Sequence, residues 1–172
     1  DALRAQFGDL ARYPDGNGFE LKAVLARKHG VTMESVTLGN GSNDVLELVA
    51  RAFLSPGSAA VFSAHAFAVY PLVTQAIGAR CNVAPAHNGS RGPKYGHDLD
   101  AMDASIDAQT RVVFIANPNN PTGTWLGNDE LRSFVEQVSR DVIVVIDEAY
   151  FEYVSEVGYP NAIAWIAEFP NL

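Results

Sequence analysis

The segment Val142–Asp147 reads Val-Ile-Val-Val-Ile-Asp and is apolar at every position before its final acid. Successive side chains of a strand point to opposite faces, so both faces of such a strand must be buried. Strands of this kind belong inside a parallel sheet that is covered by helices on each side. This one segment therefore predicts a layered α/β fold.

Strand-like runs alternate with segments of helical spacing along the rest of the chain. The expected strands are Ala59–Ser63, Arg80–Ala84, Arg111–Asn117 and Val142–Asp147. The expected helices are Phe19–His29, Asp44–Leu54, Tyr70–Gly78, Leu99–Ile106, Asp129–Ser139 and Ala162–Glu168. This alternation predicts a three-layer α/β/α fold with a mostly parallel sheet and right-handed crossovers.

Charge and composition exclude several classes of partner. The chain has 12 basic and 20 acidic residues and a net charge of -8, and its basic residues are scattered, so we expect no nucleic-acid partner. No apolar run approaches the length of a membrane span, so we expect no membrane contact. Cys81 is the only cysteine, and no histidine has a partner at metal-ligand spacing. We therefore predict a cytoplasmic protein without a disulfide or a metal site.

A glycine turn precedes one expected helix, in the segment Leu38-Gly-Asn-Gly-Ser-Asn-Asp44. Ser42, Asn43 or Asp44 is expected to cap that helix. Free N–H groups at such a helix start bind anions, so a phosphate would fit beside Gly41. The alternative is a capped helix that binds nothing.

The segment Asn117-Pro-Asn-Asn-Pro-Thr-Gly123 directly follows a buried strand. Its two prolines restrict the backbone beside the asparagines, so we expect the amide side chains to be held in place. Ligands of open α/β sheets sit at the carboxyl ends of strands, where a rigid amide suits a polar atom on a bound ring. The alternative is an elaborate turn without a ligand.

Asp147 ends an entirely apolar strand, and Tyr150 follows three residues later. A buried carboxylate without a partner is costly, so Asp147 needs a cation or a hydrogen-bond donor. A pyridinium N–H, a metal and an arginine are the candidates. The alternatives without a ligand are a helix cap and a structural ion pair.

Two further aromatic residues are candidates for ligand contact. Phe67 follows the first expected strand and could stack on a flat ligand, although core packing is the simpler role for a single phenylalanine. Tyr13, beside Pro14, begins a loop that could reach a neighbouring subunit.

Together these strand ends resemble a known family. The pair of segments 117–123 and Asp147-Glu-Ala-Tyr150 is similar to the class I/II aminotransferases of pyridoxal-phosphate (PLP) fold type I. Three further segments, namely 12–15, 41–44 and 95–100, resemble the histidinol-phosphate aminotransferase branch. The resemblance extends from Tyr13 to Leu172.

The resemblance implies a role for each of the ring-binding candidates. Asp147 would pair with the pyridine nitrogen of PLP and keep it protonated, so that the ring can accept electrons. Tyr150 and Asn120 would hydrogen-bond the phenolic oxygen of the ring. Phe67 would stack on the ring face.

The resemblance also implies a phosphate site and a dimer. Gly41, Ser42 and Asn43 would hold the cofactor phosphate through backbone N–H groups, and Tyr13 would reach the phosphate bound in the partner subunit. The complete protein would thus be a homodimer whose substrates are an amino donor and a 2-oxo acid. It would convert L-histidinol phosphate and 2-oxoglutarate to imidazole acetol phosphate and L-glutamate. Alternatives are another class I/II aminotransferase, a threonine-phosphate decarboxylase-like enzyme and a non-catalytic PLP-binding module of a regulator.

The chain departs from the family in one important respect. The family binds PLP through a Schiff-base lysine that follows a serine, and Lys22, Lys28 and Lys94 all lie in other settings. We therefore expect no Schiff-base lysine in this chain. Residues 1–12 are expected to lead into a partial PLP-binding large domain at 13–172, without the rest of that domain or the small domain.

The isolated 172 residues are expected to be inactive in transamination, because none of their lysines follows a strand and a serine. Borohydride reduction in the presence of equimolar PLP, followed by peptide mass spectrometry, checks this. We expect no stoichiometric pyridoxyl label, and such a label on any of the three lysines would contradict the prediction.

Overall fold

A computed structural model describes residues 1–172, and the chain divides into two compact units. Unit 1 is Asp1–Gly39 and unit 2 is Asn40–Leu172. This division lies after Gly39, whereas the sequence suggested a boundary after residue 12. The expected place of these residues within a larger domain stays a prediction.

Unit 1 is helical. It contains α1 (Ala2–Ala5), η1 (Phe7–Asp9), α2 (Phe19–His29) and η2 (Met33–Ser35). The Asp15 carboxylate accepts hydrogen bonds from the backbone N–H groups of Asn17 and Phe19, at 3.0 and 2.7 Å, and so defines the start of α2. Gly30 ends α2 in the left-handed conformation that glycine adopts without strain.

Unit 2 contains the predicted sheet. Its strands are β1 (Ala59–Ser63), β2 (Arg80–Ala84), β3 (Thr110–Ala116) and β4 (Ile143–Asp147). They pair in the order β2-β1-β3-β4, and every pair is parallel. The strand bounds differ from those expected by at most one residue, so the prediction of an α/β fold with a parallel sheet is confirmed.

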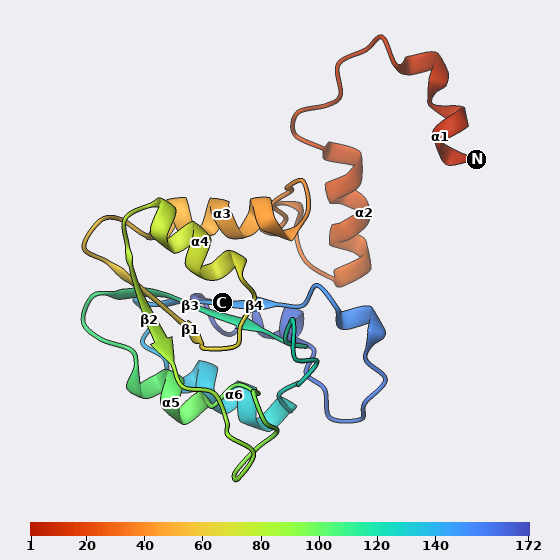
Figure 1. Cartoon of the computed structure of the whole chain (residues 1–172). Helices are drawn as coiled ribbons and strands as arrows, with labels where there is room; N and C mark the ends of the chain where they lie inside the picture. The colour runs from red at the N-terminus through yellow and green to blue at the C-terminus, as the bar shows by residue number, and fades with distance from the viewer. The chain divides into compact units, whose positions relative to one another are not determined.

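Two helices cover each face of the sheet. They are α3 (Ser42–Phe53) and α4 (Val69–Ala76) on one face and α5 (Leu99–Ala104) and α6 (Asn128–Gln137) on the other (Figure 1). Side chains of β3 alternate between the two layers: Val112 and Phe114 pack with α3 and α4, and Val113 and Ile115 pack with α5 and α6. This period of two is the reason why β3 is apolar at every position from Val112 to Ala116.

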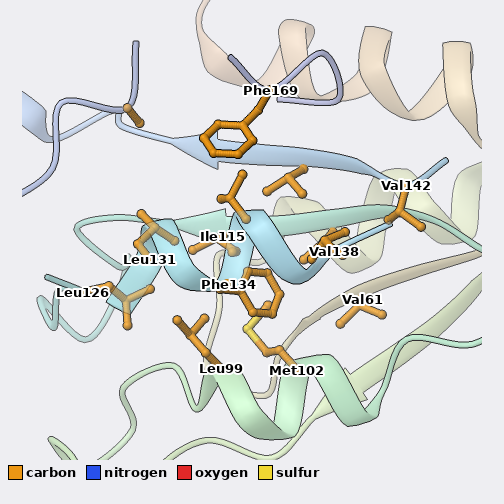
Figure 2. Close-up of a cluster of buried hydrophobic side chains, with 14 of the residues drawn as sticks. Val61, Leu99, Met102, Ile115, Leu126, Leu131, Phe134, Val138, Val142 and Phe169 are labelled. Atoms are coloured by element: carbon orange, nitrogen blue, oxygen red, sulfur yellow. The ribbon is translucent and has the colours of Figure 1, made fainter. Parts of the chain in front are cut away.

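The core beneath α5 and α6 contains more buried residues than the core beneath α3 and α4. Figure 2 shows this larger core. Met102 of α5 and Leu131 of α6 are fully buried there against Ile115 of β3. Phe169 joins this core from the last residues of the chain. The carboxyl-terminal segment therefore folds back onto the sheet.

The expected helix Ala162–Glu168 is wrong. The structure has a short 3-10 helix, η4 (Ala162–Trp165), followed by turns. The backbone bonds from Ile166 to Ile163 and from Glu168 to Trp165 span three residues, as in a 3-10 turn. Burial of Trp165 and Phe169 in the α6 core holds this tighter path, and Pro170 disfavours the helical conformation at Phe169.

The sheet register places two chemically important loops side by side. Ala116 of β3 pairs with Asp147 of β4, and the Asn117 N–H donates to the Asp147 carbonyl at 2.9 Å. The segments that begin at Asn117 and at Glu148 therefore leave the same edge of the sheet together.

Leu131→Ala is expected to lower the free energy of unfolding by about 3 kcal/mol, because it opens a cavity in a fully buried site. Gln137→Ala, on the exposed face of the same helix, is the control and is expected to change it by less than about 0.5 kcal/mol. Urea denaturation followed by circular dichroism measures both. Equal losses in the two variants would contradict the packing described for α6.

Candidate active site

A cleft lies at the carboxyl ends of β3 and β4. It brings together most of the residues that the sequence singled out, and its lining consists of Ser42, Phe67, Ala116, Pro118, Asn120, Asp147, Ala149 and Tyr150. Gly41 and Asn43 flank Ser42 in the turn at the edge of this cleft. The lining includes no lysine. Tyr13 lies in unit 1 and its side chain is fully exposed, so its expected role stays a prediction.

The Asp147 carboxylate is held by two neutral donors. The Tyr70 hydroxyl donates to Oδ2 at 2.9 Å, and the Ala149 backbone N–H donates to Oδ1 at 3.2 Å. Burial, reinforced by the neighbouring carboxylate, raises the pKa of the Tyr70 hydroxyl, so it stays protonated and remains a donor. The sequence predicted that Asp147 needs a partner, and it did not identify Tyr70.

Tyr70 could have been found only from its position in the sequence. It lies within the otherwise apolar stretch Ala66–Val73, three residues after Phe67. A tyrosine that is buried usually finds a partner for its hydroxyl. The partner is 77 residues away in the chain, however, and only the packing of α4 on the sheet brings the two together.

The asparagine-rich turn exposes one amide to the cleft and uses the other two for support. Asn117 accepts a hydrogen bond from the Leu126 N–H at 2.8 Å and donates to the Leu126 carbonyl at 3.3 Å. Asn119 donates to the His65 carbonyl at 2.9 Å. Both are buried, whereas Asn120 lines the cleft and donates to the Tyr150 hydroxyl oxygen at 3.3 Å. The expectation that the amides are held in place agrees with these bonds.

The start of α3 differs in detail from the expected cap. The helix begins at Ser42 with Gly41 as its N-cap residue, and no side chain caps it. The Asp44 carboxylate accepts instead from the Asn40 N–H at 2.9 Å. Gly41 has φ 83° and ψ 177°, a conformation that is essentially restricted to glycine. The first N–H groups of α3 therefore remain open, as an anion site requires.

Phe67 is half-buried and forms one wall of the cleft. Its ring meets the Tyr70 ring edge-on, with centroids 5.9 Å apart and an angle of 88° between the planes. Tyr70 in turn stacks on Phe114 at 4.9 Å. The wall is thus continuous with the core beneath α4, which fixes the position of Phe67.

Three polar residues near the strand ends were missed, of which His97 is buried and Tyr159 and Glu148 are partly buried. His97 lies in the loop before α5, yet it is only 3% exposed, and its Nε2 lies 2.9 Å from the carbonyl oxygen of Ala116. Burial lowers the pKa of His97. Tyr159 donates to the carbonyl of Asn117, and burial, followed by the Glu148 charge, raises its pKa.

Glu148 is the third of these groups. Its Oε1 is buried and has no hydrogen-bond partner, and burial raises its pKa to about 7. Nothing in the sequence distinguished Glu148 from an exposed acid, because only the packing of the segment around Tyr159 and Ala162 buries it.

The whole chain, residues 1–172, matches the sequence family described as aminotransferase class I and II. The chain belongs to the class I and II aminotransferase family. It is 58% identical to histidinol-phosphate aminotransferase 2 of Methylococcus capsulatus, over 100% of this chain and 46% of that protein. It is 57% identical to the protein of the same name from Pseudomonas aeruginosa, over 100% of this chain and 45% of that protein.

A solved aminotransferase structure has the same fold. The histidinol-phosphate aminotransferase of Sinorhizobium meliloti, in complex with pyridoxal 5'-phosphate, superposes with a TM-score of 0.87 at 26% identity, over 99% of this chain and 45% of that one. The predicted PLP fold type I architecture is therefore confirmed. The chain spans less than half the length of these aminotransferases. None of its helices is long and apolar enough to cross a bilayer.

Glu148 makes stability depend on pH. Its pKa of about 7 in the folded chain exceeds its ordinary value of 4.5, so the folded state binds the proton more tightly. Protonation of Glu148 is therefore expected to add to the free energy of unfolding. This contribution is complete below about pH 4.5 and is lost as the pH rises through 7. Glu148→Gln should flatten this part of the profile in urea titrations from pH 4 to 8. An unchanged slope in the variant would refute the assignment.

Proposed function

We propose that the full-length protein is a PLP-dependent aminotransferase that transfers the amino group of L-histidinol phosphate to 2-oxoglutarate. The observation that carries this proposal is the meeting of four different groups in one cleft. They are a strand-end carboxylate, a paired amide and phenol, an aromatic wall and the uncapped start of a helix.

The residues of this cleft fit pyridoxal phosphate. The open N–H groups at Ser42 and Asn43 suit its phosphate, and the glycine conformation at Gly41 leaves no Cβ in the way. Asp147 uses one lone pair on each oxygen for Tyr70 and Ala149, and a carboxylate has about four such sites. The others are available to a ring N–H.

When bound, the cofactor supplies a pyridine ring that accepts the electron pair released as the substrate loses a proton. Asp147 would hold the proton on the ring nitrogen by its negative charge. Tyr150 accepts its hydrogen bond from Asn120 and so keeps its own O–H free to donate towards the phenolic oxygen. Phe67 would cover one ring face and exclude water from it.

The choice of substrate is supported by the relatives. Two proteins that are 57–58% identical over the whole of this chain are named histidinol-phosphate aminotransferases. These relatives are about twice as long as this chain, and we propose that the lysine that holds the cofactor lies in a part of the full-length protein outside these 172 residues.

The homodimer and a cytoplasmic location belong to the same proposal. Tyr13 is fully exposed within unit 1, as expected of a side chain that reaches a partner subunit. A single cysteine without a disulfide suits a reducing compartment.

Asp147→Asn in the full-length protein is expected to lower kcat by roughly 100-fold or more, because a neutral amide no longer holds the proton on the ring nitrogen. Asp103→Asn, an exposed change on α5, is the matched control and should keep normal turnover. Formation of L-glutamate from L-histidinol phosphate and 2-oxoglutarate is the assay. Near-normal turnover in Asp147→Asn would refute the role of Asp147.

The same assay tests the substrate. The wild-type protein is expected to prefer L-histidinol phosphate over aromatic amino acids, and to release no carbon dioxide from threonine phosphate. A preference for one of these other substrates would assign the chain to a different branch of the family.

A further inference from the structure

Tyr70 is a buried polar residue that the proposed reaction does not use directly. It is 0% exposed, in the first turn of α4, and its ring is fixed on two sides. One face stacks on Phe114, with 9° between the ring planes, and Phe67 meets it edge-on. A ring held in this way has little freedom to move its hydroxyl, so the 2.9 Å bond to Asp147 Oδ2 is built into the core.

The carboxylate of Asp147 depends on this bond for its orientation. Its other protein partner is the Ala149 N–H, which lies two residues further along the same loop. Both partners are neutral, so no cation competes with a ligand for the charge of Asp147. The two donors contact different oxygens, and together they set the plane of the carboxylate.

We propose that Tyr70 is a positioning residue, which holds the Asp147 carboxylate towards the ring nitrogen of the bound cofactor. This inference rests on the proposed function. The loop before α4 would then provide the aromatic wall of the ring site, Phe67. Helix α4 itself would provide Tyr70, the donor that orients the Asp147 carboxylate. Strand β4 thus provides the Asp147 carboxylate, and α4 provides the hydrogen bond that orients it.

The test measures cofactor binding and needs no turnover. Pyridoxamine 5'-phosphate is the probe, because its amine forms no covalent bond with a lysine. A second probe is its carbocyclic analogue, in which C–H replaces the ring nitrogen. Tyr70→Phe in the full-length protein is expected to lower the affinity for pyridoxamine 5'-phosphate by about 10-fold, which is the effect of one hydrogen bond to a charged group. It should leave the affinity of the analogue unchanged, because the analogue offers Asp147 no N–H.

Two further variants separate positioning from packing. Tyr159→Phe removes another partly buried hydroxyl, which donates to the Asn117 carbonyl and does not contact Asp147. Any change in affinity that it causes is therefore expected to be the same for both probes. Tyr70→4-aminophenylalanine restores a donor of similar reach and should recover the affinity for pyridoxamine 5'-phosphate. This rescue also guards against a Tyr70→Phe variant that simply folds poorly.

A double-mutant cycle completes the test. In the Asp147→Asn background, Tyr70→Phe should cause no further selective loss, because the charge that it positions is gone. Equal weakening of both probes by Tyr70→Phe, or a selective loss that persists without Asp147, would overturn the inference and leave the proposed function standing. A wild-type protein that binds neither probe would overturn both.

Discussion

Burial of the sheet on both faces is the constraint on which the rest of unit 2 depends. Val112 to Ile115 alternate between two cores, and each core is closed by its own pair of helices. The central parts of β3 and β4 therefore carry no polar side chain, and the polar side chains that line the cleft lie where these strands end. The parallel register then brings the ends of β3 and β4 to the same edge. Layering and site location therefore have a single cause.

The site is organised by buried neighbours more than by the residues that face the cleft. Asp147 is oriented by Tyr70, whose ring belongs to the core beneath α4. Asn120 is presented by a turn that Asn117 and Asn119 attach to backbone groups elsewhere in unit 2. Preorganisation of this kind matters because a group aimed in advance need not reorganise when a ligand binds. Asp147 and Asn120 thus both depend on residues that lie behind the cleft and do not line it.

The same edge of the sheet also carries buried groups of a different kind. Glu148 follows Asp147 directly, yet one of these acids faces the cleft with two donors and the other has a buried oxygen without any. Neighbouring residues that leave a strand point in different directions, and their environments diverge accordingly. Two adjacent carboxyl groups therefore have different hydrogen-bond partners and different burial, which a sequence of two acids does not indicate.

The amino-acid sequence by itself determined the layered fold, the strand bounds to within a residue and the set of loops that form the cleft, because these follow from apolar periodicity and from local turn chemistry. It also identified Ser42, Phe67, Asn120, Asp147 and Tyr150 as neighbours. Only the tertiary structure decided that Tyr70 holds Asp147, that His97 and the Oε1 atom of Glu148 are buried, and that 162–168 forms a 3-10 helix with turns. These features arise from contacts between residues distant in the chain, and no local pattern encodes which of them will meet.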